Sequence, residues 1–250
     1  PLVEKSLGEN FDGGKLVALN IWFRHIIFFV YPLASVLIIA VTISQIDLLD
    51  AILYLFPLFA VSFVIGYLYY LHSLPNKGNA YSSAESRVPL LILLMAPIIQ
   101  VTLKYLGAPM GLSTFIAIWT ALLLSSIYKK VRNVLTLIKK VKAWNFALIL
   151  LAIVFYAEAF KRSGISEILK SYITSVVVFS IVASFILGFA TGRVQLSITI
   201  LIPIVMEIVG QVPMGIFIII YSLSMVGYLM SPAHPCLVLT AEYFKVDLMK

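Results

Sequence analysis

The chain alternates between long apolar stretches and short polar ones, and the apolar stretches have the length of membrane spans. No charged residue occurs in residues 26–46, 51–71, 105–128 or 171–192. A helix of about 20 apolar residues crosses the hydrocarbon core of a bilayer. Each of these stretches is therefore predicted to be a transmembrane helix. Proline lies inside some of them, at Pro32 and Pro57 for example, and is expected to kink the helix.

Two shorter apolar stretches, 88–103 and 143–157, are also predicted to span the membrane. They contain or adjoin residues that suit a membrane surface, namely Lys104, Trp144 and Tyr156. The pattern as a whole predicts an all-α, polytopic membrane protein with about 6–8 membrane segments. We expect it to be a multi-pass protein of the cell membrane.

Composition agrees with a membrane protein and changes how the charge is interpreted. Hydrophobic residues make up 62% of the chain and charged residues 12%, whereas soluble domains are about half apolar and a quarter charged. The net charge of +7 is therefore not a signal for nucleic acid. Three His and one Cys are too few for a zinc cluster or a disulfide framework. His234 and Cys236 alone are weak evidence for a metal, so we expect no metal and no cofactor.

The distribution of Lys and Arg predicts the orientation. Eleven lie before the first span, in 73–87 and in 129–142, whereas four lie in the alternate gaps. The richer set is expected on the cytoplasmic side. Residues 129–142, KKVRNVLTLIKKVK, place apolar positions at helical spacing opposite the bases, which predicts an amphipathic helix on the lipid surface.

These features predict a division of the chain. Residues 1–25 form a cytoplasmic polar or interfacial segment, residues 26–128 a four-helix scaffold part, and residues 129–142 the cytoplasmic amphipathic helix. Residues 143–250 form the transport part. The chain opens on Pro1 and stops directly after an apolar region, so we expect it to be a fragment of a longer protein.

A polar interruption divides the apolar segment 172–209. Gly192 permits a turn, and Thr191 and Gln195 bring hydrogen-bonding groups into it. Arg193 would cost roughly 2.5–3.5 kcal/mol at the centre of a membrane helix unless it is paired or solvated. Two apolar arms joined by a short tip predict a re-entrant hairpin, whose irregular backbone is covered by protein or faces a water-filled cavity. Two short full spans, or a loop between spans, are the alternatives.

A second interruption breaks the apolar run 214–241. Pro232 and Pro235 lie three residues apart, so a regular helix cannot continue through them. We predict a discontinuous helix with Ser231 and His234 in its gap. Paired interruptions of this kind are the best sequence pointer to the midplane site of a secondary transporter.

Both interruptions resemble those of the ion-transporter superfamily of secondary carriers, which includes gluconate, citrate, dicarboxylate, lactate and arsenite carriers. FATGRVQLSITILIPIV, residues 189–205, looks like its hairpin-tip motif, and SPAHPCLVLTAEYF, residues 231–244, looks like its unwound helix. The stretches RHIIFFVYPL and SPAHPCLVL are closest to an uncharacterised prokaryotic integral-membrane family within that group. The resemblance implies an inverted-repeat fold, elevator-type movement and a homodimer.

Carried over by position, the resemblance places Thr191, Gly192 and Arg193 at the tip and residues 231–234 in the unwound segment. The tip lacks the Ser-Asn-Thr of the dicarboxylate carriers, so their sodium binding and substrate class do not carry over. The expected substrate-binding residues are Thr191, Gly192, Arg193, Gln195, Ser231 and His234.

Other ionisable residues have weaker predictions. His234 and Glu207 are candidates for proton or ion coupling, and Glu207 could equally be an interfacial residue. Glu158 lies four residues before Arg162, the spacing of a local ion pair on a helix. His25 lies at the end of a predicted span, where we expect an interfacial side chain.

The sequence therefore predicts a secondary active transporter of a small organic anion, coupled to H⁺ or Na⁺ and in contact with membrane lipids. No G-x-x-x-x-G-K-[ST] loop is present, so the chain is not itself an ATPase. We expect no enzyme, because paired Asp residues or a His pair on adjacent spans are not evident. An intramembrane enzyme and a non-transporting scaffold subunit are the alternatives.

Overall fold

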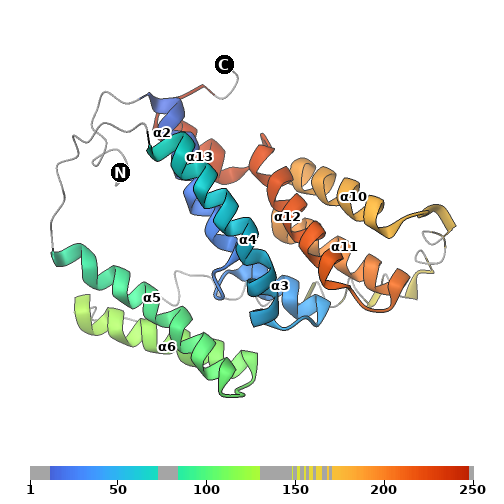
Figure 1. Ribbon diagram of the computed structural model, residues 1–250, viewed down its shortest axis with the longest axis horizontal. Coiled ribbons are helices and arrows are strands. Elements are labelled where there is room, and N and C mark those ends of the chain that lie inside the picture. Colours follow the sequence, from blue (N-terminus) through green and yellow to red (C-terminus); the bar gives the residue numbers. More distant parts are fainter. Residues whose placement is uncertain are drawn as a thin grey trace. The chain divides into compact units, whose positions relative to one another are not determined.

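The computed structural model describes residues 12–72, 84–129 and 171–247, with scattered positions between 148 and 168. Helices make up the described part of the chain, and no strand occurs in it. The chain divides into two compact units, residues 1–81 with 163–250 and residues 82–162 (Figure 1). The predicted amphipathic helix, 129–142, lies outside the described residues except for Lys129, and so does most of the predicted span 143–157.

The first unit begins with a helical segment that is interrupted at residues 30–34. Its elements in this region are α2 Gly13–Ile26, the 3-10 turn η1 Ile27–Phe29, α3 Ser35–Ser44, α4 Leu48–Gly66 and the π-helical turn η2 Tyr67–Leu71. Short carboxylates begin two of these helices. Asp12 accepts a hydrogen bond from the Gly14 N–H at 3.1 Å, and Asp47 accepts one from the Leu49 N–H at 2.8 Å. These bonds satisfy N–H groups that have no partner within the helix.

The second part of this unit contains the two predicted interruptions. Its helices are α10 Val176–Thr191, α11 Val194–Val209, α12 Met214–Met230 and α13 Pro235–Tyr243. Two residues separate α10 from α11, so the segment 172–209 contains a tight helical hairpin. Four residues separate α12 from α13, and the predicted discontinuous helix is therefore confirmed.

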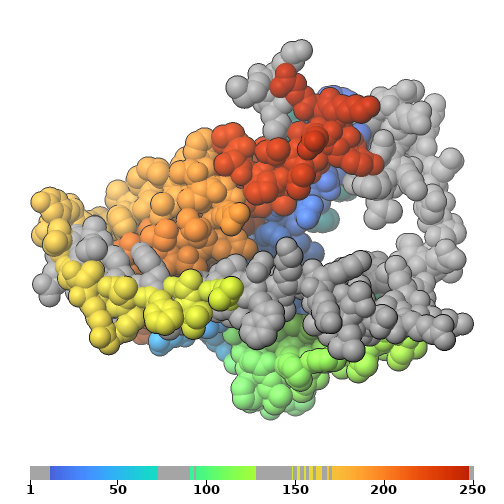
Figure 2. Space-filling view, turned by 180° about the vertical axis from the view of Figure 1, so that it is seen from behind, coloured from blue at the N-terminus to red at the C-terminus, as the bar shows by residue number. Residues whose placement is uncertain are grey.

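The two ends of the sequence pack together within this unit. α13 contacts α2, while α11 contacts α3 and α10 contacts α12. Val17 and Ile21 of α2 form a buried cluster with Ala241 of α13, and Cys236 packs against this cluster. Figure 2 shows the red C-terminal segment directly against the blue N-terminal helices. Side chains more than 200 residues apart in sequence can therefore meet in one site.

The prediction of one span over 26–46 is wrong as a single helix. The helix ends at Phe29, and the chain turns through residues 30–34 before α3 begins at Ser35. Pro32 lies in this gap and lacks the N–H that a continuous helix needs, so it ends the helix rather than kinking it. Tyr221 of α12 donates a hydrogen bond at 2.7 Å to the carbonyl oxygen of Phe28, which faces the gap without a helical partner.

The predicted scaffold part, 26–128, is a functional division and stays a prediction. By contacts, residues 1–81 group with residues 163–250 instead. The second unit contains α5 Ala84–Tyr105 and α6 Met110–Lys129, which pack against each other. The Gln100 amide donates to the Thr114 hydroxyl at 2.8 Å across this pair.

Another prediction in the second unit is confirmed. Arg162 Nε donates to Glu158 Oε1 at 2.6 Å, so the two residues form the local ion pair expected from their spacing. Both side chains are largely exposed, and such a pair contributes little to stability.

Among the described residues, three helices are long and apolar enough to cross a membrane: Leu48–Leu71, Met110–Ile127 and the combined segment Met214–Tyr243. Shorter apolar helices occur at Ser35–Ser44, Val176–Thr191 and Val194–Val209. Large apolar side chains are exposed on α4 and α6, including Leu53, Val61 and Phe115. An exposed surface of this kind suits lipid rather than water, so the helices indicate a membrane protein.

Candidate functional site at the hairpin tip and the helix break

The tip of the α10–α11 hairpin lies directly against the gap between α12 and α13. Gly192 ends α10 with a φ of 57°, a left-handed conformation that favours glycine. A Cβ placed on Gly192 would lie 2.6 Å from the Ala233 oxygen and 3.1 Å from the His234 nitrogen. Only glycine allows the two backbones to approach this closely. The structure thus brings the two sequence interruptions into contact.

Hydroxyl groups on both sides of this contact bind the backbone. Ser231 is fully buried, donates to the Phe189 carbonyl at 2.5 Å and accepts from the Ala233 N–H at 3.2 Å. Thr191 donates to the Leu187 carbonyl at 2.6 Å and accepts from the Arg193 N–H at 3.3 Å. These two predicted binding residues therefore shape the tip and the gap, and their hydroxyl protons are already used in hydrogen bonds.

Two helix N-termini meet at this contact. Arg193 precedes the first turn of α11 and His234 precedes the first turn of α13, and neither side chain caps its helix. The N-terminus of a helix carries a partial positive charge and N–H groups without helical partners. Such ends favour an anion, while the C-termini of α10 and α12, which carry the opposite partial charge, lie at the same contact.

The remaining predicted residues lie at different distances from the contact. Arg193 is exposed at the tip, and its guanidinium has no ion-pair partner among the described residues. Gln195 is half-buried in the first turn of α11. Glu207 lies in the last turn of α11, thirteen residues beyond Val194, which corresponds to roughly 20 Å along a helix. Glu207 is therefore not brought to the tip.

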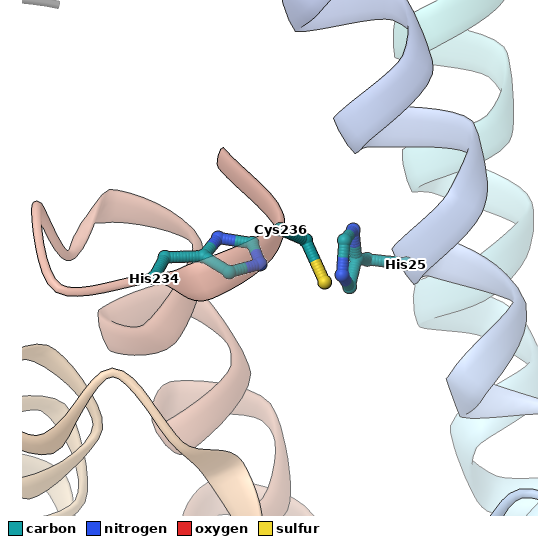
Figure 3. Close-up of side chains that lie close together, drawn as sticks. All are labelled: His25, His234 and Cys236. Carbon is teal, nitrogen blue, oxygen red and sulfur yellow. The ribbon is translucent and has the colours of Figure 1, made fainter. Parts of the chain in front are cut away.

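A cluster of two imidazoles and a thiol lies on the other side of the same gap. His25 of α2, His234 of the gap and Cys236 of α13 place their ligand atoms within 4.8 Å of one another. Figure 3 shows the Cys236 thiol close to the His25 ring, with His234 opposite. The exposed fractions of His25 and His234 are 1% and 0%. These buried polar side chains are therefore removed from bulk solvent.

Hydrogen bonds fix the state of His25. Its Nδ1 lies 2.6 Å from the Ile21 carbonyl oxygen, and because a carbonyl can only accept, Nδ1 carries the proton. Nε2 therefore has a free lone pair, and it accepts from the Tyr228 hydroxyl at 3.1 Å. The same hydroxyl lies 3.8 Å from Cys236 Sγ. One hydroxyl proton is thus shared between two acceptors.

His234 is not satisfied in the same way. Neither of its ring nitrogens has a hydrogen-bond partner in the described part of the chain, although both are buried. The Tyr228 ring covers the imidazole at a centroid distance of 3.9 Å. A buried polar group without a partner costs about 1–3 kcal/mol, and such a group calls for an explanation.

Comparison with known families decides one question. A family model described as "Protein of unknown function (DUF401)" matches residues 1–250. The chain belongs to this family. No curated protein and no solved structure matches the chain. This family has no assigned function, as expected from the resemblance to an uncharacterised family. The match does not show the wider ion-transporter superfamily, which is part of the proposal below.

Sequence reasoning on this DUF401 chain missed His25. We expected an interfacial side chain, but the residue is buried against the helix break. The local sequence gives one signal, because RHIIFFVYPL begins at Arg24 and contains the proline that ends the first helix. Nothing in local periodicity connects His25 with a residue 209 positions later (234 − 25 = 209).

A surface hollow of the DUF401 chain lies away from both features. Its volume is about 470 Å³, and Asp12, Lys15, Tyr69 and Tyr70 are among its lining residues. The lining residue nearest to His25 in sequence is Leu19, six residues before it, or roughly 9 Å along a helix. No residue of the hairpin tip or of the cluster lines this hollow, so we assign it no function.

Proposed function

We propose that this chain carries the substrate site of a secondary active transporter for a small organic anion. The observation that carries the proposal is the meeting of two uncapped helix N-termini beside Arg193. Half-helix N-termini that face one another at a break are the anion-binding device of many secondary transporters. The sequence resemblance to the ion-transporter superfamily supports the same function.

Arg193 is the residue we propose to bind the substrate charge. Its guanidinium is exposed and has no ion-pair partner among the described residues. Guanidinium offers a fork that matches a carboxylate with two hydrogen bonds, which Lys cannot reproduce. Gln195, two residues further on and half-buried, is the second residue that we propose to donate to the anion. Thr191 and Ser231 hold the tip and the gap in shape.

The contacts of Ser231 favour transport over an enzyme. A serine nucleophile needs a base within hydrogen-bond reach, but the Ser231 hydroxyl donates to the Phe189 carbonyl. Neither ring nitrogen of His234 accepts from it. We extend the proposal to coupling by H⁺ or Na⁺ and to the cell membrane, as expected from the sequence analysis, and to a homodimer, as the sequence resemblance implies. His234 and Glu207 are the candidates for coupling.

Uptake of anions into proteoliposomes tests the proposal. We would reconstitute the purified protein, impose a proton or sodium gradient, and screen a panel of labelled mono-, di- and tricarboxylates. Arg193→Gln should lower the apparent affinity for the transported anion by roughly 30-fold or more, because loss of a charge partner in a binding site costs about 2–5 kcal/mol. Arg193→Lys should be intermediate.

Arg162→Gln is the matched control, because Arg162 is also exposed but pairs locally with Glu158. It should leave uptake unchanged. Equal reconstitution density for the wild type and the three variants must be verified by quantitative immunoblot. Unchanged affinity and rate in Arg193→Gln would remove Arg193 from the site, and no gradient-driven uptake of any tested anion would overturn the transport proposal.

A further inference from the structure

The cluster of His25, His234 and Cys236 has the composition of a metal site. Two imidazoles and a thiol suit late first-row transition metals such as Zn²⁺, whereas Mg²⁺ and Ca²⁺ prefer oxygen ligands. The two side chains from the α12–α13 break would bind together with one from α2, so the ion would join distant parts of the first unit.

The distances are close to those that zinc needs. All three ligand atoms lie within 4.8 Å of one another. In a tetrahedral zinc site, with Zn–N of about 2.0–2.1 Å and Zn–S of about 2.3 Å, ligand atoms lie roughly 3.3–3.8 Å apart. Side-chain rotations that move the ligand atoms by about 1 Å would therefore bring them to the distances of a zinc site, without a change of fold.

The hydrogen bonds around the cluster are those of a prepared ligand set. The Ile21 carbonyl oxygen accepts from His25 Nδ1 at 2.6 Å, which aims the Nε2 lone pair at the cluster. Metal-binding histidines almost always donate their second ring nitrogen in this way, and the bond fixes both tautomer and orientation. His25 needs only to exchange the Tyr228 hydroxyl for the metal.

The unsatisfied nitrogens of His234 are the second, independent observation. This imidazole is completely buried, and neither nitrogen has a partner in the described part of the chain. A metal bond would satisfy one of them. His234 also lies two residues before Cys236 at the start of α13, with Pro235 between them, so both ligands come from one short piece of backbone.

We propose that His25 Nε2, a ring nitrogen of His234 and the Cys236 thiolate bind one Zn²⁺ ion, with a fourth position open to water or to an anionic oxygen. Three protein ligands and one open position are the arrangement of zinc sites that bind an exchangeable ligand. The inference does not rest on the proposed transport function, and it extends the site from the hairpin tip to α2.

Cobalt binding tests the site directly, because Co²⁺ replaces Zn²⁺ and gives a spectrum. We would titrate the detergent-purified, metal-free protein with Co²⁺. The expected result is one bound ion per chain with intense visible bands of tetrahedral cobalt and a thiolate charge-transfer band in the near ultraviolet. Zn²⁺ should displace the cobalt. The charge-transfer band reports Cys236, because the chain contains one cysteine.

Substitutions separate binding from folding. Cys236→Ser and His234→Ala should each weaken Zn²⁺ binding at least 100-fold, and Cys236→Ser should abolish the charge-transfer band. His72→Ala is the matched control, since His72 is the remaining histidine and is exposed at the end of η2. It should bind Zn²⁺ as the wild type does. Size-exclusion elution of every variant must match the wild type.

Thermal stability gives a second test that does not depend on the cobalt spectrum. Zn²⁺ added to the metal-free wild type should raise its Tm, and a chelator should reverse the rise. The same addition should leave the Tm of Cys236→Ser unchanged. The proposal is overturned if the wild type binds no stoichiometric Zn²⁺ or Co²⁺, or if binding persists in both Cys236→Ser and His234→Ala. A failure of anion uptake with normal metal binding would instead count against the transport proposal alone.

Discussion

Two gaps interrupt helices in the described part of the first unit, and the two gaps differ in how their polar groups are satisfied. The gap at 30–34 is largely apolar, and Tyr221 donates to the nearby Phe28 carbonyl at 2.7 Å. The gap at 231–234 contains buried Ser231 and His234, and His234 has no hydrogen-bond partner among the described residues. The first gap is closed by the protein itself, whereas the second presents groups that a ligand can use.

This difference shows why a broken helix alone does not identify a binding site. Breaking a helix frees backbone groups, and a buried free group must be satisfied. Where a side chain such as Tyr221 is positioned to do so, the break is structural. Where the hairpin tip with Arg193 and two helix N-termini converge, the break is suited to a ligand. The experiments below test this contrast.

The largest effect is expected at Gly192, where the hairpin tip contacts the second gap. Gly192→Ala should lower the free energy of unfolding by about 2–5 kcal/mol, because it adds a left-handed backbone cost of about 1–2 kcal/mol and an overpacking cost of about 1–3 kcal/mol. The added Cβ would meet the Ala233 backbone, which cannot yield as a side chain can. Thermal or denaturant unfolding in detergent measures the loss.

Gly210→Ala separates these two costs. Gly210 also has a positive φ, 83°, but a Cβ placed there would meet nothing within 4 Å. Its ψ of −44° lies outside the left-handed helical region, and alanine in such sparsely populated backbone costs about 1–3 kcal/mol. A loss below about 2 kcal/mol in Gly192→Ala, within the backbone cost alone, would mean that the contact between tip and gap contributes nothing.

An intermediate loss of stability is expected when one hydroxyl group is removed at each gap. Tyr221→Phe removes the bond to Phe28, and Ser231→Ala removes the bond to Phe189. Each should lower the free energy of unfolding by about 1 kcal/mol, the net contribution of a hydrogen bond. Unfolding and proteoliposome uptake would be measured on the same preparations.

The two variants should differ in uptake. Ser231→Ala should lower transport because the second gap loses its shape, and Tyr221→Phe should leave it near the wild-type rate. If Tyr221→Phe impairs uptake as strongly as Ser231→Ala, the first gap is also part of the site and the contrast between the gaps fails.

The smallest expected change in stability concerns the first residue of the helix that follows each gap. Pro235 occupies the first turn of α13, where its fixed φ suits a helix start and its missing N–H is not needed. Pro235→Ala should lower stability by about 0.4–1 kcal/mol. Ser35 begins α3 after an extended Ala34, so Ser35→Pro should raise stability by a similar amount. A loss of stability in Ser35→Pro would show that the Ser35 N–H is used.

Much of the second gap could be predicted from sequence because its signals are local. Pro232 and Pro235 predicted the break, and Gly192 predicted the turn that separates α10 from α11. The same reasoning failed at Pro32, which we expected to kink a single span. A proline inside an apolar run has the same local signature whether the helix ends near it, as at Pro32, or continues through it, as at Pro57. The hydrogen bond that satisfies the Phe28 carbonyl at the break comes from Tyr221 of a distant helix.

The cluster of His25, His234 and Cys236 could be predicted only in part, because the sequence drew attention to His234 and Cys236 but not to His25. Periodicity reports which face of a helix is buried, but not which helix covers it. His25 is brought to His234 by the packing of α2 on α13, and this contact depends on the fold of the whole unit. The Ile21 carbonyl that orients His25 is likewise a backbone group, which carries no signal in the amino-acid sequence.

The packing of α2 on α13 also sets a time order for biosynthesis. A ribosome adds about 5–20 residues per second, so the 209 residues between His25 and His234 (234 − 25 = 209) take about 10–40 s. During that interval Val17 and Ile21 lack the partner that buries them in the finished chain. This face of α2 therefore lacks its contacts with α13 for many seconds after α2 has been synthesised.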